Sequence, residues 1–82
     1  MDRGESVNKE KRNDLLSAIK LLENAKNVVE SVRDKEQDCL DNMPENFEGS
    51  ERYINMETAI DLMDSAVDAI DEACDSIGEA MN

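Results

Sequence analysis

The chain has no histidine, and this absence removes the commonest general base and the imidazole ligand of most zinc and di-iron sites. No glycine-rich phosphate loop and no EF-hand calcium loop can be aligned on its 82 residues. Loose binding of Mg²⁺ or Ca²⁺ to its many carboxylates would be weak and unspecific. We therefore expect a protein that is not an enzyme and that has no cofactor and no dedicated metal site.

Long apolar runs are also missing. No stretch approaches the roughly 20 apolar residues of a membrane span, and residues 1–5 are too charged for a secretory signal. The net charge of −12 disfavours direct contact with nucleic acid or an anionic membrane, because both require Lys and Arg. We expect a cytoplasmic protein with no nucleic-acid or membrane partner.

Proline, glycine and aromatic residues are scarce, and most of them gather in one place. The segment 38–53 holds the only proline, Pro44, one of three glycines, Gly49, and both aromatics, Phe47 and Tyr53. Pro44 lacks the N–H that a helix interior needs. Beyond it, Gly49 supplies a flexible residue and the serine that follows is a strong helix N-cap. This segment therefore predicts the end of one helix and the start of another.

The break divides the chain into one domain of two long antiparallel helices, an all-α helical hairpin. Ser6 and Asn8 are candidate caps for the first helix. The expected boundaries are a frayed stretch over 1–7, a helix over about 8–43, a loop over about 44–50 and a second helix over about 51–80.

The first helical segment carries a heptad row of apolar residues with one polar interruption, Glu36. This predicted seam is Leu15, Ala18, Leu22, Ala25, Val29, Val32, Glu36, Cys39 and Met43. Ile19, Leu21, Val28 and Leu40 flank the seam and widen its apolar face.

The second helical segment carries three lengthwise rows. The main seam steps regularly by three and four residues through Tyr53, Met56, Ile60, Met63, Val67, Ile70, Cys74, Ile77 and Met81. A row of small residues lies one position behind it and forms a candidate interface: Ala59, Leu62, Ala66, Ala69 and Ala73. An acidic row lies one position ahead and forms a candidate docking face: Asp61, Asp64, Asp68, Asp71 and Asp75. Two adjacent apolar rows exceed what one neighbouring helix can cover.

This excess predicts association. Two hairpins that dimerise would form a four-helix bundle with the alanine row at or near the interface, and a C2 dimer is the commonest closed form. A different protein that supplies the missing helices is the alternative. In a hairpin that folds near residues 46 and 47, Cys39 and Cys74 would lie about 30 Å apart, too far for an intrachain disulfide.

The acidic half of the chain allows a second function. Residues 42–82 contain one Arg and eleven Asp or Glu, a net charge of −10, whereas residues 1–41 contain eight Lys or Arg and ten Asp or Glu, a net charge of −2. The leading hypothesis is a non-enzymatic interaction or structural module that self-associates through the second helix. The alternative is an acidic decoy, a nucleic-acid mimic that binds a basic protein partner.

The loop residues Asp41, Asn42, Pro44, Phe47 and Tyr53 form a motif with two interpretations. The two aromatics can anchor a partner, or they can close the loop end of the bundle, which we favour because the core has few large side chains.

Around the break, the pattern Asp-Asn-x-Pro-Glu followed by Ser-Glu-Arg, at 41–45 and 50–52, resembles a group of short bacterial proteins. The resemblance covers roughly residues 36–75. These proteins occur in Firmicute genomes, often in phages and other mobile elements. The resemblance implies a cytoplasmic bacterial setting and a mobile-element origin, and it implies no activity and no functional residue.

Overall fold

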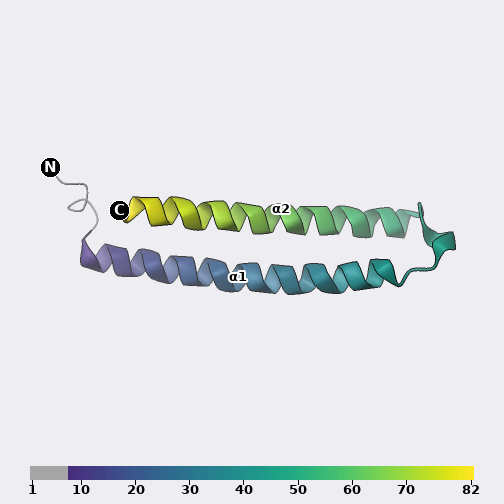
Figure 1. Ribbon diagram of the computed structural model, residues 1–82, viewed down its shortest axis with the longest axis horizontal. Coiled ribbons are helices and arrows are strands. Elements are labelled where there is room, and N and C mark those ends of the chain that lie inside the picture. The colour runs from purple at the N-terminus through teal and green to yellow at the C-terminus, as the bar shows by residue number, and fades with distance from the viewer. Residues whose placement is uncertain (1–7) are drawn as a thin grey trace.

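Two long helices packed side by side make up the protein (Figure 1). The computed structural model describes residues 8–82, so the segment 1–7, predicted to fray, lies outside the described residues. Helix α1 spans Lys9–Asp41, a short 3₁₀ helix η2 spans Glu45–Phe47, and α2 spans Glu51–Ala80. The helices run antiparallel in an extended hairpin of 65 × 18 × 13 Å. The predicted all-α helical hairpin is confirmed.

Polar side chains cap both helices at their N-termini. The Asn8 side chain accepts a hydrogen bond from the Lys11 N–H at 2.9 Å, and the Ser50 hydroxyl accepts one from the Tyr53 N–H at 3.2 Å. Gly49 precedes the second cap with φ of +80°, a left-handed conformation that costs other residues energy because of their Cβ atom. Gly49 and Ser50 thus turn the chain into α2 as the sequence predicts.

The loop between the helices begins after the last backbone hydrogen bonds of α1. The N–H of Asn42 still donates to the Asp38 carbonyl, and the N–H of Met43 to the Leu40 carbonyl. Pro44 then takes an extended conformation with φ of −60° and ψ of 146°, because its ring excludes continuation of the helix. Helix α1 therefore ends just before the proline, within two residues of the predicted boundary.

The main seam of α2 faces α1 along its whole length. Every one of its nine predicted residues, from Tyr53 to Met81, is buried or half-buried. Met56 and Ile60 are 8 % and 5 % exposed, and they are the only buried hydrophobic side chains within residues 8–82. The core is therefore thin, and its best-covered part lies near the loop.

The seam of α1 differs from its prediction. Ala25, Val32 and Cys39 are exposed, and five residues outside the predicted seam are half-buried. Those five are Ile19, Lys26, Arg33, Gln37 and Leu40. The helix is rotated slightly relative to the apolar row, and this rotation brings Lys26 and Arg33 to aspartates of α2. Their long aliphatic stems can lie along the seam while the charged groups reach its edge.

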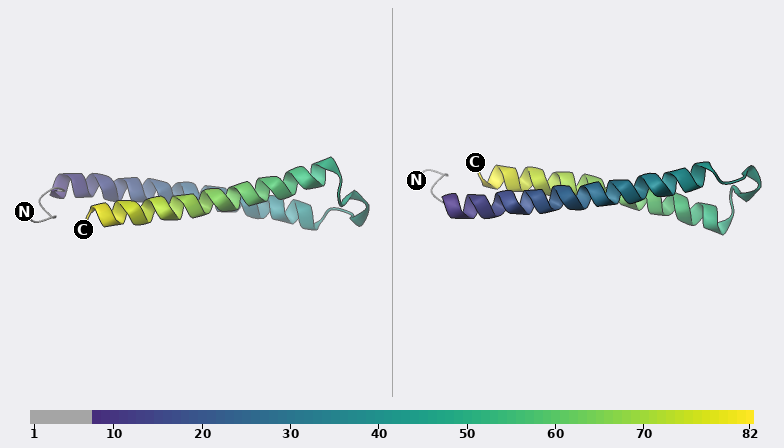
Figure 2. Two further views of the ribbon diagram at one scale, coloured as in Figure 1. Left: turned by 90° about the horizontal axis from the view of Figure 1, so that it is seen from above. Right: turned by 90° about the horizontal axis from the view of Figure 1, so that it is seen from below.

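The ion pairs also fix the register of the hairpin. Lys26 lies opposite Asp71 and Arg33 opposite Asp64, so facing residues have numbers that sum to 97. The chain therefore folds near residues 48 and 49, about two residues later than predicted. Viewed from above and below, the helices cross at a shallow angle (Figure 2). Cys39 and Cys74 are free thiols, and this register separates them by about 24 Å along the hairpin.

Candidate interaction surfaces

The predicted interface row of α2 lies along one edge of the contact with α1. Ala59, Ala66 and Ala73 are half-buried there, whereas Ala69 and Leu62 are exposed, Leu62 to 65 %. The structure thus places the inner residues of the row beside α1 and leaves the outer ones uncovered.

A second apolar row is uncovered on α1. Leu21 and Val28 are 70 % and 63 % exposed, and Val32 is 49 % exposed. From the sequence, Val32 was expected in the seam and Leu21 and Val28 on its flank. With Ala25 and Cys39, these residues step by four, three, four and seven positions along α1. They follow a heptad spacing of their own.

The two uncovered rows lie on the same side of the hairpin. On each helix, the uncovered residues come one position before the residues that contact the other helix. One position corresponds to a rotation of about 100° around the helix axis. Because the helices run in opposite directions, this rotation places the uncovered residues of both helices on the same side of the hairpin. A cavity of about 260 Å³ supports this placement, because Cys39 and Arg52 line it together. Cys39 comes one position before the half-buried Leu40, and Arg52 comes one position before the half-buried Tyr53. We call this side the apolar face: Leu21, Ala25, Val28, Val32, Cys39, Ala59, Leu62, Ala66, Ala69 and Ala73.

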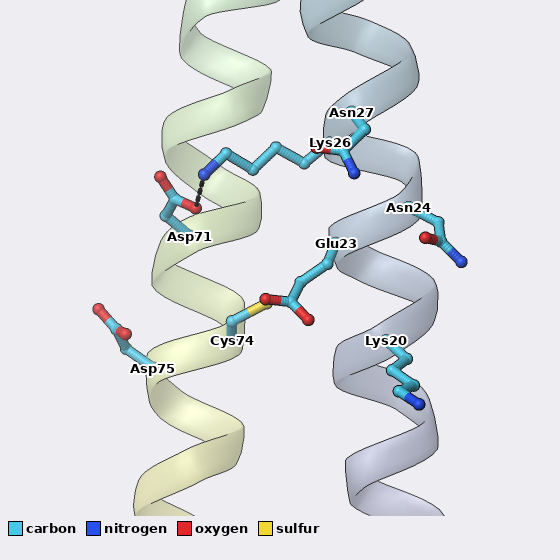
Figure 3. Close-up of a pocket in the computed structure, with 8 residues that line it drawn as sticks. All are labelled: Lys20, Glu23, Asn24, Lys26, Asn27, Asp71, Cys74 and Asp75. Atoms are coloured by element: carbon cyan, nitrogen blue, oxygen red, sulfur yellow. Dashed lines mark ion pairs between the residues drawn. The ribbon is translucent and has the colours of Figure 1, made fainter.

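The opposite side carries the ion pairs. The Lys26 ammonium lies 2.8 Å from an Asp71 oxygen, and the Arg33 Nε donates to Asp64 at 2.9 Å. Both aspartates come one position after a seam residue, so they lie on the side away from the apolar face. Figure 3 shows Lys26 reaching across from α1 to Asp71. These pairs join the helices at two levels one heptad apart.

Lys26 and Arg33 are contact residues that were not predicted from the sequence. A signal was present, because Lys26 and Arg33 are seven residues apart, as are Asp64 and Asp71. Two cations and two anions with equal spacing on antiparallel helices can pair at both levels at once.

The candidate acidic docking face is therefore divided by its ion pairs. All five aspartates are exposed. Asp64 and Asp71 pair with α1, whereas the other three form no ion pair within residues 8–82. An open groove of about 900 Å³ lies on this side, lined by Lys20, Glu23, Asn24, Lys26, Asn27, Asp71, Cys74 and Asp75 (Figure 3). Lysines of α1 and acids of α2 share the groove, so its charge is mixed.

The loop motif gathers in part. Asn42, Pro44 and Phe47 line the 260 Å³ cavity together with Met43 and Met56. Phe47 is 47 % exposed, so it covers this end of the seam with one face and meets solvent with the other. Asp41 points away to accept a hydrogen bond from the Gln37 side chain at 2.9 Å, and Tyr53 is half-buried in the seam.

Three groups along the contact between the helices hold their protons more tightly than usual. The hydrogen bond and charge of Asp71 raise the pKa of Lys26. Burial raises the pKa of the Cys74 thiol, and Glu23 with other nearby carboxylates adds to the effect. Burial, followed by the charge of Glu57, likewise raises the pKa of Tyr53.

These shifts predict a protein that weakens in alkali. Above the ordinary pKa values of thiols, phenols and ammonium groups, about 8.5 to 10.4, the unfolded chain releases protons that the folded hairpin retains. The stability that these three groups contribute is therefore fully present below about pH 8.5 and is lost as pH rises. The urea midpoint, followed by circular dichroism, should decrease from neutral pH to about pH 10. Cys74→Ala should remove the earliest part of the decrease, and a midpoint that stays level would contradict the prediction.

Neither a metal cluster nor a membrane helix is found in the part of the chain that the structure describes. No group of three or more His, Cys, Asp or Glu in residues 8–82 could hold a metal ion. No helix in the same range is long and apolar enough to cross a bilayer. Comparison with models of protein families, with curated proteins and with solved structures gave no match. The resemblance to short Firmicute proteins therefore stays a prediction.

Proposed function

We propose that this protein is a non-enzymatic helical interaction module that associates with a second copy of itself. The observation that carries the proposal is the apolar face, where Leu21, Val28 and Leu62 are each at least 63 % exposed. Contiguous exposed apolar side chains mark interaction sites in soluble proteins.

The thin core supports the same proposal. Within residues 8–82 the hairpin buries only two hydrophobic side chains, neither of them completely, and a chain of 82 residues has little other surface to bury. Small folds of this kind gain stability from a disulfide, a metal or a partner subunit. Both cysteines are free, so a partner subunit is the form of support that fits the apolar face.

The test is the mass of the protein in solution. Light scattering coupled to size-exclusion chromatography should give twice the chain mass of 9.2 kDa. A mass of 9.2 kDa at tens of micromolar would rule out self-association.

An acidic decoy for a basic protein remains a second candidate. It is favoured by the position of Asp61, Asp68 and Asp75, which are exposed and lie away from the apolar face, so a dimer would leave them accessible. It is weakened by Asp64 and Asp71, whose charges are already paired within the hairpin. A pull-down at low salt that recovers no basic protein would exclude it.

A further inference from the structure

The apolar face is asymmetric in size and in charge. Its α1 half carries the larger side chains Leu21, Val28 and Val32, whereas its α2 half is mainly alanine. The chain up to residue 41 has a net charge of −2, and the chain from residue 42 has −10. One face thus presents a bulky, nearly neutral row beside a small, strongly acidic one.

Two face-to-face arrangements of a symmetric dimer are possible. With the twofold axis across the helices, α1 would pack on α1 and α2 on α2 of the partner, and the two loops would lie at opposite ends. With the axis along the helices, each α1 would pack on the partner's α2, and both loops would lie at the same end. Neighbouring helices are antiparallel in both arrangements.

We infer that the dimer axis runs along the hairpin, so that α1 packs on the partner's α2 and the two loops meet at one end. This inference rests on the self-association proposed above. The bulky row of each copy then fits against the alanine row of the other, which is the alternation of large and small residues that close packing requires. The two acidic helices lie diagonally, whereas the other arrangement would stack one −10 segment on another.

A second copy is the occupant that this face fits. A twofold axis along the helices places the bulky row of each copy on the small row of the other. A face made of one bulky and one small row is therefore complementary to itself. The face is about 27 Å long, from Leu21 to Cys39, and about 20 Å wide. Two such faces would bury about 1,100 Å² in total, which is close to the lower limit for a specific interface.

Spin labels can test the arrangement on the full chain. In a Cys39→Ala, Cys74→Ala background, Glu48→Cys places one label in the loop, and Ser31→Cys places one on the outer side of α1, level with the middle of the apolar face. Pulsed electron–electron distances across the dimer should be below about 40 Å at both sites, because helices in a bundle lie 8–10 Å apart. With the loops at opposite ends, the Glu48→Cys distance would be about 50 Å or more.

The two sites separate two kinds of failure. A short distance at Ser31→Cys with a long one at Glu48→Cys would overturn the arrangement and leave self-association standing. A missing intermolecular distance at both sites, with a monomer mass, would overturn self-association itself.

Discussion

Val28→Asp and Leu62→Asp should each convert the protein to a monomer. Both side chains are more than 60 % exposed in the single hairpin and lie on the apolar face, one on each helix. Burial of such a side chain contributes about 1.5–3 kcal/mol, and a symmetric dimer contains every contact twice. The loss is then at least about 3 kcal/mol, which raises the dissociation constant by at least about 100-fold. A buried, unpaired carboxylate adds a further penalty.

Leu16→Asp is the matched control for this experiment. Leu16 is 49 % exposed and follows the seam residue Leu15, so it lies on the side of the ion pairs. The substitution makes the same chemical change in the same helix. Light scattering at equal concentration should give a dimer for Leu16→Asp and 9.2 kDa for the other two variants. A dimer that persists in Val28→Asp and Leu62→Asp would show that the apolar face is not the interface.

Ile60→Ala should have the largest effect on folding of any single truncation in α2. Ile60 is 5 % exposed, the lowest value among the buried hydrophobic side chains. Truncation of a buried isoleucine to alanine costs about 2–5 kcal/mol. Native domains are stable by about 5–15 kcal/mol in total, so this loss would be a large part of the margin. Urea unfolding, followed by helical circular dichroism at one fixed protein concentration, should show this as a lower midpoint.

Ile54→Ala provides the comparison. Ile54 is 51 % exposed on the same helix, and alanine is a better helix former than isoleucine. Its urea midpoint should stay close to that of the unchanged protein. If Ile60→Ala and Ile54→Ala behave alike, the hairpin does not derive its stability from the seam near the loop.

The helices could be predicted from sequence because their signals are local. Pro44, Gly49 and Ser50 determine where the helices end and begin, and the regular spacing from Tyr53 to Met81 determines which side of α2 faces α1. The rotation of α1 could not be read in the same way. Its apolar residues spread beyond one row, so periodicity alone left several orientations open. In the orientation that the helix adopts, Lys26 and Arg33 meet aspartates that are distant in sequence.

The candidate site shows the same limit. The alanine row of α2 was visible in the sequence, but its continuation on Leu21, Val28 and Val32 appears only once α1 is rotated. The acidic row was also visible in the sequence, and the register of the hairpin determines which of its aspartates pair with α1. Contacts between distant residues therefore decided which surface is apolar and which is charged.

The place of the buried residues determines the order in which the hairpin assembles. Met56 and Ile60 lie close to the turn, where the facing residues of α1 are separated from them by a short loop. Closing a short loop has the lowest entropic cost. Folding should therefore begin at the turn and proceed toward the other end of the hairpin, where α1 begins and α2 ends. The slowest amide hydrogen exchange should then fall around Ile60 and the fastest near Lys9 and Ala80. We therefore expect the hairpin to form its helix contacts first at the turn and to lose them first at the opposite end.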